Sequence, residues 1–90
     1  MIKVKQLANY QFIINDHENI TFQSYDSIIV SIPANQSGKY PTLLDKTYWN
    51  YSKTTSKYRN KFLNETTKET QAKINRGEYV LTDLNAWNPI

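Results

Sequence analysis

Apolar and polar residues alternate along the first half of the chain, in the pattern typical of strands with one buried face. Residues 10–14 and 20–24 are rich in β-formers and flank the polar residues 15–19, so they predict an antiparallel hairpin. Residues 28–32, Ile-Ile-Val-Ser-Ile, are the strongest strand signal, and their apolar run favours a central strand covered on both faces. Weaker strand patterns lie at residues 2–7, at residues 40–44, where Pro41 favours an edge position, and at residues 78–82.

The second half of the chain changes to helical periodicity. Thr55, Tyr58 and Phe62 recur at a spacing that places them on one side of a helix running from about Lys53 to near Asn64. Ser52 is the expected N-cap of this helix, with Thr54 and Thr55 as alternatives. Residues 66–69, Thr-Thr-Lys-Glu, fit a capping box and predict a second helix over residues 67–76, which Gly77 ends in the left-handed conformation.

This order of elements indicates an α+β fold. We expect a single domain over residues 1–90, with a mostly antiparallel sheet of four or five strands and two short helices on one face. The tail over residues 85–90 has no regular pattern, and its Trp87 is predicted either to clamp onto the domain's own core or to anchor a partner.

Composition limits the chemistry that the chain can carry. Ninety residues build one modest core, and an aromatic content of 13% favours an ordered domain. The absence of cysteine excludes disulfides, thiolate catalysis and cysteine-based zinc sites. No apolar segment near the start has the length of a signal peptide or a spanning helix, so we expect a cytoplasmic protein with no membrane partner.

Catalytic and metal-binding patterns are also missing from the sequence. The single histidine, His17, lies in a polar turn between Asp16 and Glu18, and no second histidine can complete a metal site with it. The other carboxylates are scattered, and two glycines do not make a phosphate-binding loop. We therefore expect a protein that is not an enzyme and that needs no cofactor and no metal.

Positive charge is concentrated in one part of the chain. The formal net charge is +3, and eight basic residues but only two acidic ones lie between residues 46 and 76. Within this segment Lys53, Lys57 and Lys61 recur at every fourth residue, which predicts a cationic ridge along the first helix. Like charges at this spacing repel each other by a few tenths of a kcal/mol per pair, which a fold can tolerate without any functional reason. The ridge is nevertheless the surface where we expect a partner.

Two interpretations of the ridge remain open at this point. In the first, its lysines contact successive phosphates, neighbouring hydroxyl groups donate hydrogen bonds, Arg59 supplies a fork, and the exposed members of Trp49, Tyr51 and Tyr58 stack on bases. In the second, the lysines form a solvated helix face and the aromatic residues belong to the core. The candidate binding residues for a protein partner or a nucleic acid are Trp49, Lys53, Thr54, Ser56, Lys57, Arg59 and Lys61.

Two sequence segments carry a resemblance to known proteins. Residues 22–27, Phe-Gln-Ser-Tyr-Asp-Ser, precede the Ile/Val run, and residues 48–58 read Tyr-Trp-Asn-Tyr-Ser-Lys-Thr-Thr-Ser-Lys-Tyr. Together they resemble a family of short uncharacterised proteins from phages and mobile elements of low-GC Gram-positive bacteria. The Tyr-Ser-x-Thr-Thr-x-Lys-Tyr motif is the specific part, and the similarity covers roughly residues 20–80. The resemblance implies a setting, the cytoplasm of a bacterial host, and assigns no functional residue.

Small phage proteins without catalytic groups mostly act by binding. We therefore expect a non-enzymatic accessory protein that binds and inhibits a host protein, with nucleic-acid-directed defence machinery such as a nuclease complex as the target class, as for anti-CRISPR proteins. The alternative is a small basic DNA- or RNA-binding protein that uses Lys53, Lys57 and Lys61. A third hypothesis is a structural or assembly factor of the virion.

Overall fold

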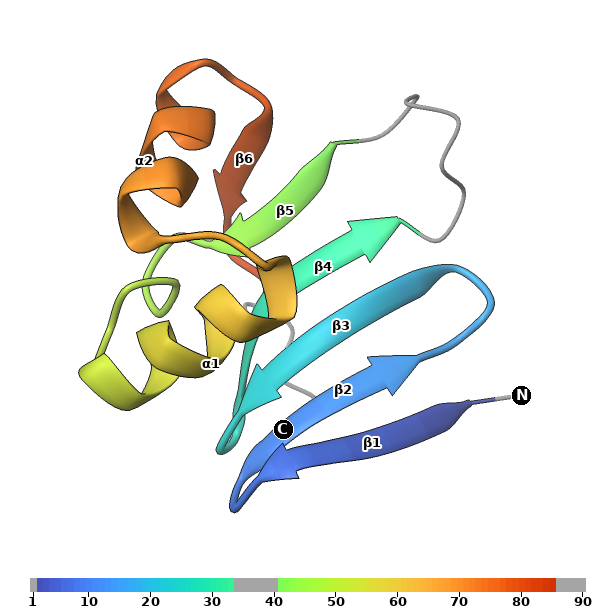
Figure 1. The fold of residues 1–90 in the computed structure, drawn as a ribbon. Coiled ribbons are helices and arrows are strands. Elements are labelled where there is room, and N and C mark those ends of the chain that lie inside the picture. Colours follow the sequence, from blue (N-terminus) through green and yellow to red (C-terminus); the bar gives the residue numbers. More distant parts are fainter. Residues whose placement is uncertain (1, 34–40, 86–90) are drawn as a thin grey trace.

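The computed structural model describes residues 2–33 and 41–85, which form an α+β domain with a six-stranded sheet and two helices on one of its faces (Figure 1). The strands lie side by side in chain order, and all neighbouring pairs are antiparallel except β5 and β6, which the two helices connect. The elements are β1 (Lys3–Ala8), β2 (Gln11–Asn15), β3 (Asn19–Ser24), β4 (Ser27–Pro33), β5 (Thr42–Asp45), α1 (Lys53–Leu63), α2 (Thr67–Asn75) and β6 (Tyr79–Thr82).

The fold class is confirmed, and the sheet has six strands rather than the four or five expected, because both weak segments at residues 2–7 and 40–44 form strands. The predicted edge position of the strand near Pro41 is wrong. Pro41 precedes β5 and removes no donor from its ladder, so β5 pairs with β4 on one side and β6 on the other. Trp87 lies outside the described residues.

The core lies between the helices and the middle of the sheet. Phe22, Val30 and Leu44 face one another across β3, β4 and β5, and each has 0% of its surface exposed. Ile29 joins them because the register of β3 and β4 shifts after Phe22, which is the mark of a β-bulge. The Phe62 ring of α1 stacks on the Phe22 ring with 5.6 Å between centroids, and this contact seats α1 on the sheet.

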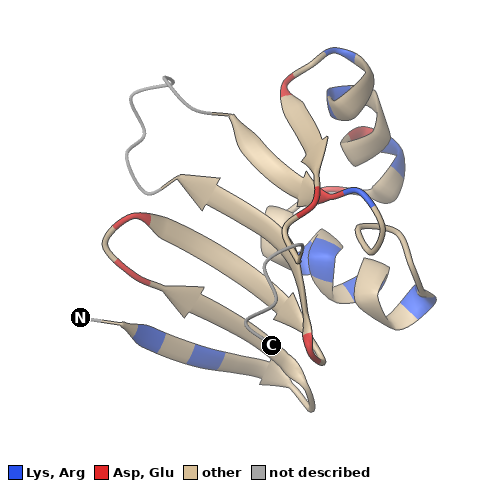
Figure 2. Ribbon diagram, turned by 180° about the vertical axis from the view of Figure 1, so that it is seen from behind, with Lys and Arg blue, Asp and Glu red and all other residues tan. Residues whose placement is uncertain are grey.

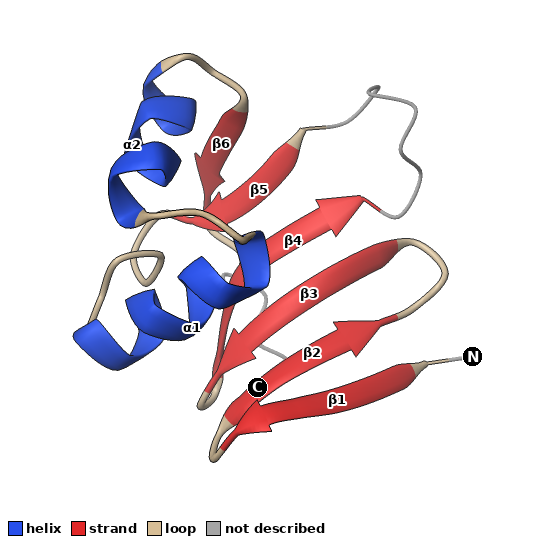
Figure 3. Ribbon diagram, in the orientation of Figure 1, coloured by secondary structure: helices blue, strands red, loops and turns tan. Residues whose placement is uncertain are grey.

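β4 occupies the interior position expected for residues 28–32, but the two helices cover only one face of the sheet (Figure 3). The expectation of coverage on both faces is therefore not met by the described elements. An apolar run of this kind also suits an interior strand of a sheet with helices on one side, because the neighbouring strands shield its backbone and much of its side chains.

Tyrosines occupy strained positions in the two tight turns at one end of the sheet. Tyr10, between β1 and β2, has φ 63°, and Tyr25, between β3 and β4, has φ 55°. The left-handed conformation costs a residue with a Cβ roughly 1–2 kcal/mol. The N–H of Tyr25 donates to the Tyr10 carbonyl oxygen at 2.7 Å, and the two rings stack with 5.2 Å between centroids. The hydrogen bond and the ring stacking therefore connect the two turns, and both tyrosine rings are exposed at the surface.

The helix ends follow the local signals in the sequence. Ser52 is the N-cap of α1, and its hydroxyl accepts a hydrogen bond from the Thr55 N–H at 3.1 Å. Thr66 and Glu69 form the expected capping box at the start of α2. Gly77 follows α2 with φ +80°, which confirms the predicted left-handed glycine.

The conformation of Gly77 gives a prediction about stability. A Cβ at this position would meet no atom within 4 Å, so a substitution there is strained only through the backbone. We expect Gly77→Val to lower the free energy of unfolding by roughly 1–2 kcal/mol and Gly77→Asn by less, because asparagine tolerates this conformation. Urea denaturation of the three proteins measures the difference, and a Val variant as stable as the parent would contradict the left-handed helix end.

Candidate functional site

The first helix presents a row of lysines to solvent. Lys53, Lys57 and Lys61, which we call the lysine face, are all exposed, and each step of four residues advances about 6 Å along the axis. Figure 2 shows basic residues along both helices. Within the part of the chain that the structure describes, none of these three lysines forms an ion pair. Thr54, another candidate residue, is exposed beside them.

Two lysines of the lysine face contact the aromatic ring of Tyr58. The Nζ atom of Lys57 lies 5.4 Å from the centroid of the Tyr58 ring, and that of Lys61 lies 5.2 Å from it. Cation–π contacts at exposed sites contribute about 0.5–1 kcal/mol each. Tyr58 also packs against the hydrophobic core and is only partly exposed. Its ring is therefore engaged within the domain and is not a free platform for a base.

Arg59 departs most from the sequence-based expectation, because its side chain is completely buried. One terminal nitrogen donates to the Trp49 carbonyl oxygen and, at 3.5 Å, to Asn50 Oδ1. The other donates to Asn60 Oδ1 at 2.9 Å and to Thr67 Oγ1 at 2.8 Å. Burial lowers the pKa of the Arg59 guanidinium. The expected exposed fork for a phosphate is thus replaced by an internal clamp that joins the segment before α1 to α2.

Two further candidate residues support this clamp instead of facing solvent. The Trp49 ring is partly buried against the core, and its centroid lies 5.1 Å from the central carbon of the Arg59 guanidinium. The Ser56 hydroxyl donates to Asn50 Oδ1 at 2.8 Å and accepts from the guanidinium at 3.3 Å. The lysine face and Thr54 are the candidate residues left exposed. The spacing of Arg59, four residues after the buried Thr55, is the signal by which its burial could have been predicted.

A second polar cluster ties α2 to β6 and removes one lysine from the basic surface. Glu65 accepts hydrogen bonds from the Tyr79 hydroxyl and from Lys73 Nζ, the latter at 3.3 Å, and its side chain is only 4% exposed. Burial, together with the adjacent Glu65 carboxylate, raises the pKa of Tyr79 to about 12. Lys73 is consequently a structural partner of a buried carboxylate.

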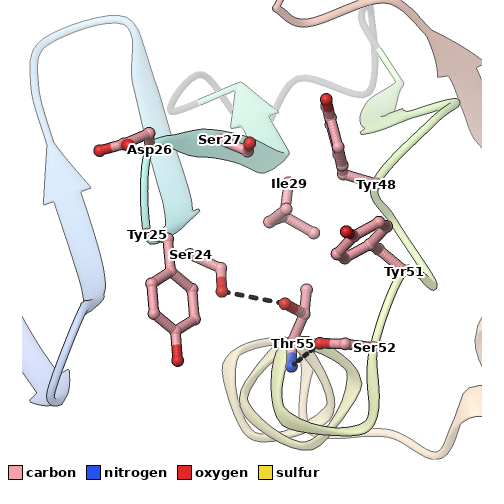
Figure 4. A pocket seen from close by; sticks show the side chains of 9 residues that line it. All are labelled: Ser24, Tyr25, Asp26, Ser27, Ile29, Tyr48, Tyr51, Ser52 and Thr55. Carbon is pink, nitrogen blue, oxygen red and sulfur yellow. Dashed lines mark hydrogen bonds between the residues drawn. The ribbon is translucent and has the colours of Figure 1, made fainter.

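A pocket of about 260 Å³ opens where α1 begins (Figure 4). Its base includes a buried hydrogen bond of 3.0 Å between the hydroxyls of Ser24 and Thr55. The rings of Tyr48 and Tyr51 meet edge to face at its side, with centroids 5.5 Å apart and planes at 70°. The lining residues are Ser24, Tyr25, Asp26, Ser27, Ile29, Tyr48, Tyr51, Ser52 and Thr55.

The patterns in the sequence did not predict this pocket. Its two halves lie in the two segments that carried the family resemblance, and that juxtaposition was the available signal. Among the described residues, no three metal-ligating side chains come together. Neither described helix has the length and apolarity that crossing a membrane requires.

The chain belongs to the Family of unknown function (DUF8033), whose model matches residues 1–79. No curated protein and no solved structure matches the chain. Membership of an uncharacterised family agrees with the resemblance seen in the sequence, whereas the phage setting and the specific motif stay predictions.

The burial of Arg59 predicts a sharp contrast between two neighbouring basic residues. Arg59→Gln should lower the free energy of unfolding by roughly 2–4 kcal/mol, because several buried acceptors lose their donor at once. Lys57→Gln should change it by no more than about 0.5 kcal/mol. Urea denaturation of both variants checks this, and equal small effects would show that the guanidinium does not hold the helices together.

Proposed function

We propose that this protein is a non-enzymatic accessory protein of a phage or mobile element that binds a host protein through the lysine face and inhibits it by steric occlusion. The observation that carries the proposal is the row of Lys53, Lys57 and Lys61, exposed and without ion pairs among the described residues. A cationic row of this kind selects an acidic partner surface and speeds association with it. The phage setting rests on the family resemblance alone.

The internal contacts of α1 favour a protein partner over a nucleic acid. Proteins that bind single strands combine basic grooves with aromatic rings on which bases stack. Here the Tyr58 ring lies between two lysines, the Trp49 ring faces Arg59, and Arg59 itself is buried. The lysines that remain supply electrostatic contact, which positions a partner but does not read bases.

Nucleic-acid-directed defence machinery fits this surface as a target class. Nucleases that use divalent metals hold them with clustered carboxylates. A row of lysines about 12 Å long is complementary to such an acidic cleft and could block it without entering the reaction. The positive net charge of +3 argues against the opposite strategy, in which an inhibitor imitates DNA with an acidic surface.

Direct nucleic-acid binding is the second candidate, and the spacing of the lysine face favours it. Steps of about 6 Å bring successive lysines within reach of phosphates along one strand. Three such contacts would give a slope of about −2.7 in log affinity against log salt concentration for a duplex.

A pair of charge-matched variants separates these candidates. One replaces Lys53, Lys57 and Lys61 by Gln, and the other replaces the exposed lysines Lys3, Lys5 and Lys68 by Gln. Both lose the same charge, and we expect both to fold with stability close to that of the parent. Immobilised parent and control should capture the same host protein from nuclease-treated lysate, and the lysine-face variant should lose at least about tenfold in association rate.

The nucleic-acid measurement uses the same proteins with a labelled duplex and a labelled single strand at two salt concentrations. We expect dissociation constants of about 10⁻⁴ M or weaker at physiological salt. Tight binding with a steep salt slope that vanishes only in the lysine-face variant would replace the inhibitor hypothesis by the nucleic-acid one. Capture that is equal for all three proteins would show that the lysine face is a solvated surface.

A further inference from the structure

We propose that the pocket at the start of α1 accepts a large apolar side chain, with the ring of a phenylalanine as the best fit, from an acidic segment of a partner protein. The inference rests on the proposed function in taking the partner to be a protein with an acidic surface. The pocket lies between the turn that joins β3 to β4 and the first turn of α1, together with the segment that leads into that helix.

The polar groups at the base of the pocket are already bonded within the domain. The hydroxyls of Ser24 and Thr55 form a hydrogen bond of 3.0 Å, and Ser52 Oγ accepts from the Thr55 N–H at 3.1 Å. The Asp26 carboxylate points away from the pocket (Figure 4), and the lining is mainly apolar. A polar ligand would lose its hydrogen bonds to water at this base without replacing them, whereas an apolar group gains by leaving water.

The size and the walls of the pocket suit one aromatic ring. Its volume is about 260 Å³, and an apolar cavity of about 150 Å³ is sufficient to hold a benzene molecule. The Tyr48 and Tyr51 rings at its side stand at 70° to each other, so an inserted ring can contact a face of one and an edge of the other. Tyr51 is 71% exposed, and a partner that fills the pocket would cover it.

The opposite side of the pocket is fixed in advance by the two strained turns. Tyr25 lines the pocket with φ 55°, and its ring is stacked on that of Tyr10, which has φ 63°. Strained residues of this kind cluster at binding sites, and a wall that is already fixed loses little conformational freedom on binding. Both rings are more than half exposed. An apolar anchor in a pocket surrounded by exposed tyrosines is the usual arrangement of an interface hot spot.

The charges at the start of α1 favour acidic residues on either side of this anchor. Lys53 follows Ser52 of the pocket wall directly, and the first turn of α1 contains no acidic residue. The partial positive charge of a helix N-terminus adds to that of the lysine. Asp26 is the single carboxylate among the lining residues, and it is exposed and directed away. The pocket therefore provides an apolar anchor point beside the first residue of the lysine face, and charge complementarity selects an acidic segment.

The test is an NMR titration of the whole chain with the peptide acetyl-Glu-Phe-Glu-amide. We expect saturable shifts of the amides of Ser27, Ile29 and Tyr51, and nuclear Overhauser contacts between the phenylalanine ring and the methyl groups of Ile29. Acetyl-Glu-Ala-Glu-amide should bind at least about tenfold more weakly, because it lacks the ring that leaves water. Acetyl-Lys-Phe-Lys-amide should bind about threefold more weakly, because its charges are repelled at the start of α1.

Variants connect the binding to the pocket. Tyr51→Ala removes an exposed wall and should weaken the Glu-Phe-Glu peptide about threefold or more. Val4→Ala truncates an apolar side chain that is 62% exposed and does not line the pocket, so it should leave the affinity unchanged. The lysine-face variant should lose the preference for glutamate over lysine peptides and keep the preference for phenylalanine over alanine. Failure of the lysine face and failure of the pocket are therefore separate results.

Two results would overturn the proposal. The first is equal affinity for the phenylalanine and alanine peptides, or binding of the phenylalanine peptide without contacts to Ile29. The second is a shift of the Ser27, Ile29 and Tyr51 amides that grows with protein concentration in the absence of peptide, because it would assign the pocket to a second copy of this chain.

Discussion

The buried guanidinium of Arg59 is the interaction on which the arrangement of the helices depends. Transfer of this charge from water to the interior costs several kcal/mol, and the cost is offset by donors that reach Trp49, Asn50, Asn60 and Thr67. These partners belong to the segment before α1, to α1 itself and to the start of α2. One side chain thus fixes three parts of the helical layer relative to one another.

The same interaction decides which side of α1 faces solvent. Thr55, Arg59 and Phe62 recur at helical spacing on the inner side of α1, where Thr55 and Arg59 are buried and Phe62 stacks on Phe22 of the sheet. Lys53, Lys57 and Lys61 are consequently turned outward. The hydroxyl groups of Thr55 and Ser24 also form a hydrogen bond, which holds the start of α1 against the β3–β4 turn. The pocket forms between these two segments. The lysine face and the pocket are therefore two results of one docking geometry.

Local signals in the sequence were sufficient for the fold class and for the helix ends. Ser52, the Thr66–Glu69 capping box and Gly77 act through bonds to residues at most a few positions away, and the structure contains all three. The interior position of β5 was not predictable in this way, because it depends on pairing with β6, which lies far along the chain. A proline that precedes a strand gives no information about which neighbours that strand acquires.

In the candidate site, too, local patterns predicted some features, whereas others depend on contacts between residues that are distant in sequence. Helical spacing was sufficient to predict the exposure of the lysine face and would also have placed Arg59 on the same side of α1 as Thr55. The hydrogen-bond partners of Arg59 lie partly in two other segments, and no local pattern identifies them. The pocket similarly combines the turn between β3 and β4 with the segment that leads into α1, about 25 residues later in the chain. Residues that act through contacts distant in sequence were therefore the ones that pattern analysis placed incorrectly or did not find.

Hydrogen exchange at the arginine side chains tests the role of the Arg59 clamp most directly, because the exposed Arg76 of the same chain serves as an internal reference. In nitrogen-detected or proton–nitrogen spectra at mildly acidic pH, we expect the terminal N–H groups of Arg59 to exchange at least about tenfold more slowly than those of Arg76. We also expect their protection to follow that of the core amides of Phe22 and Val30 as urea is added. Exchange of Arg59 as fast as that of Arg76 would contradict the buried clamp and, with it, the outward orientation assigned to the lysine face.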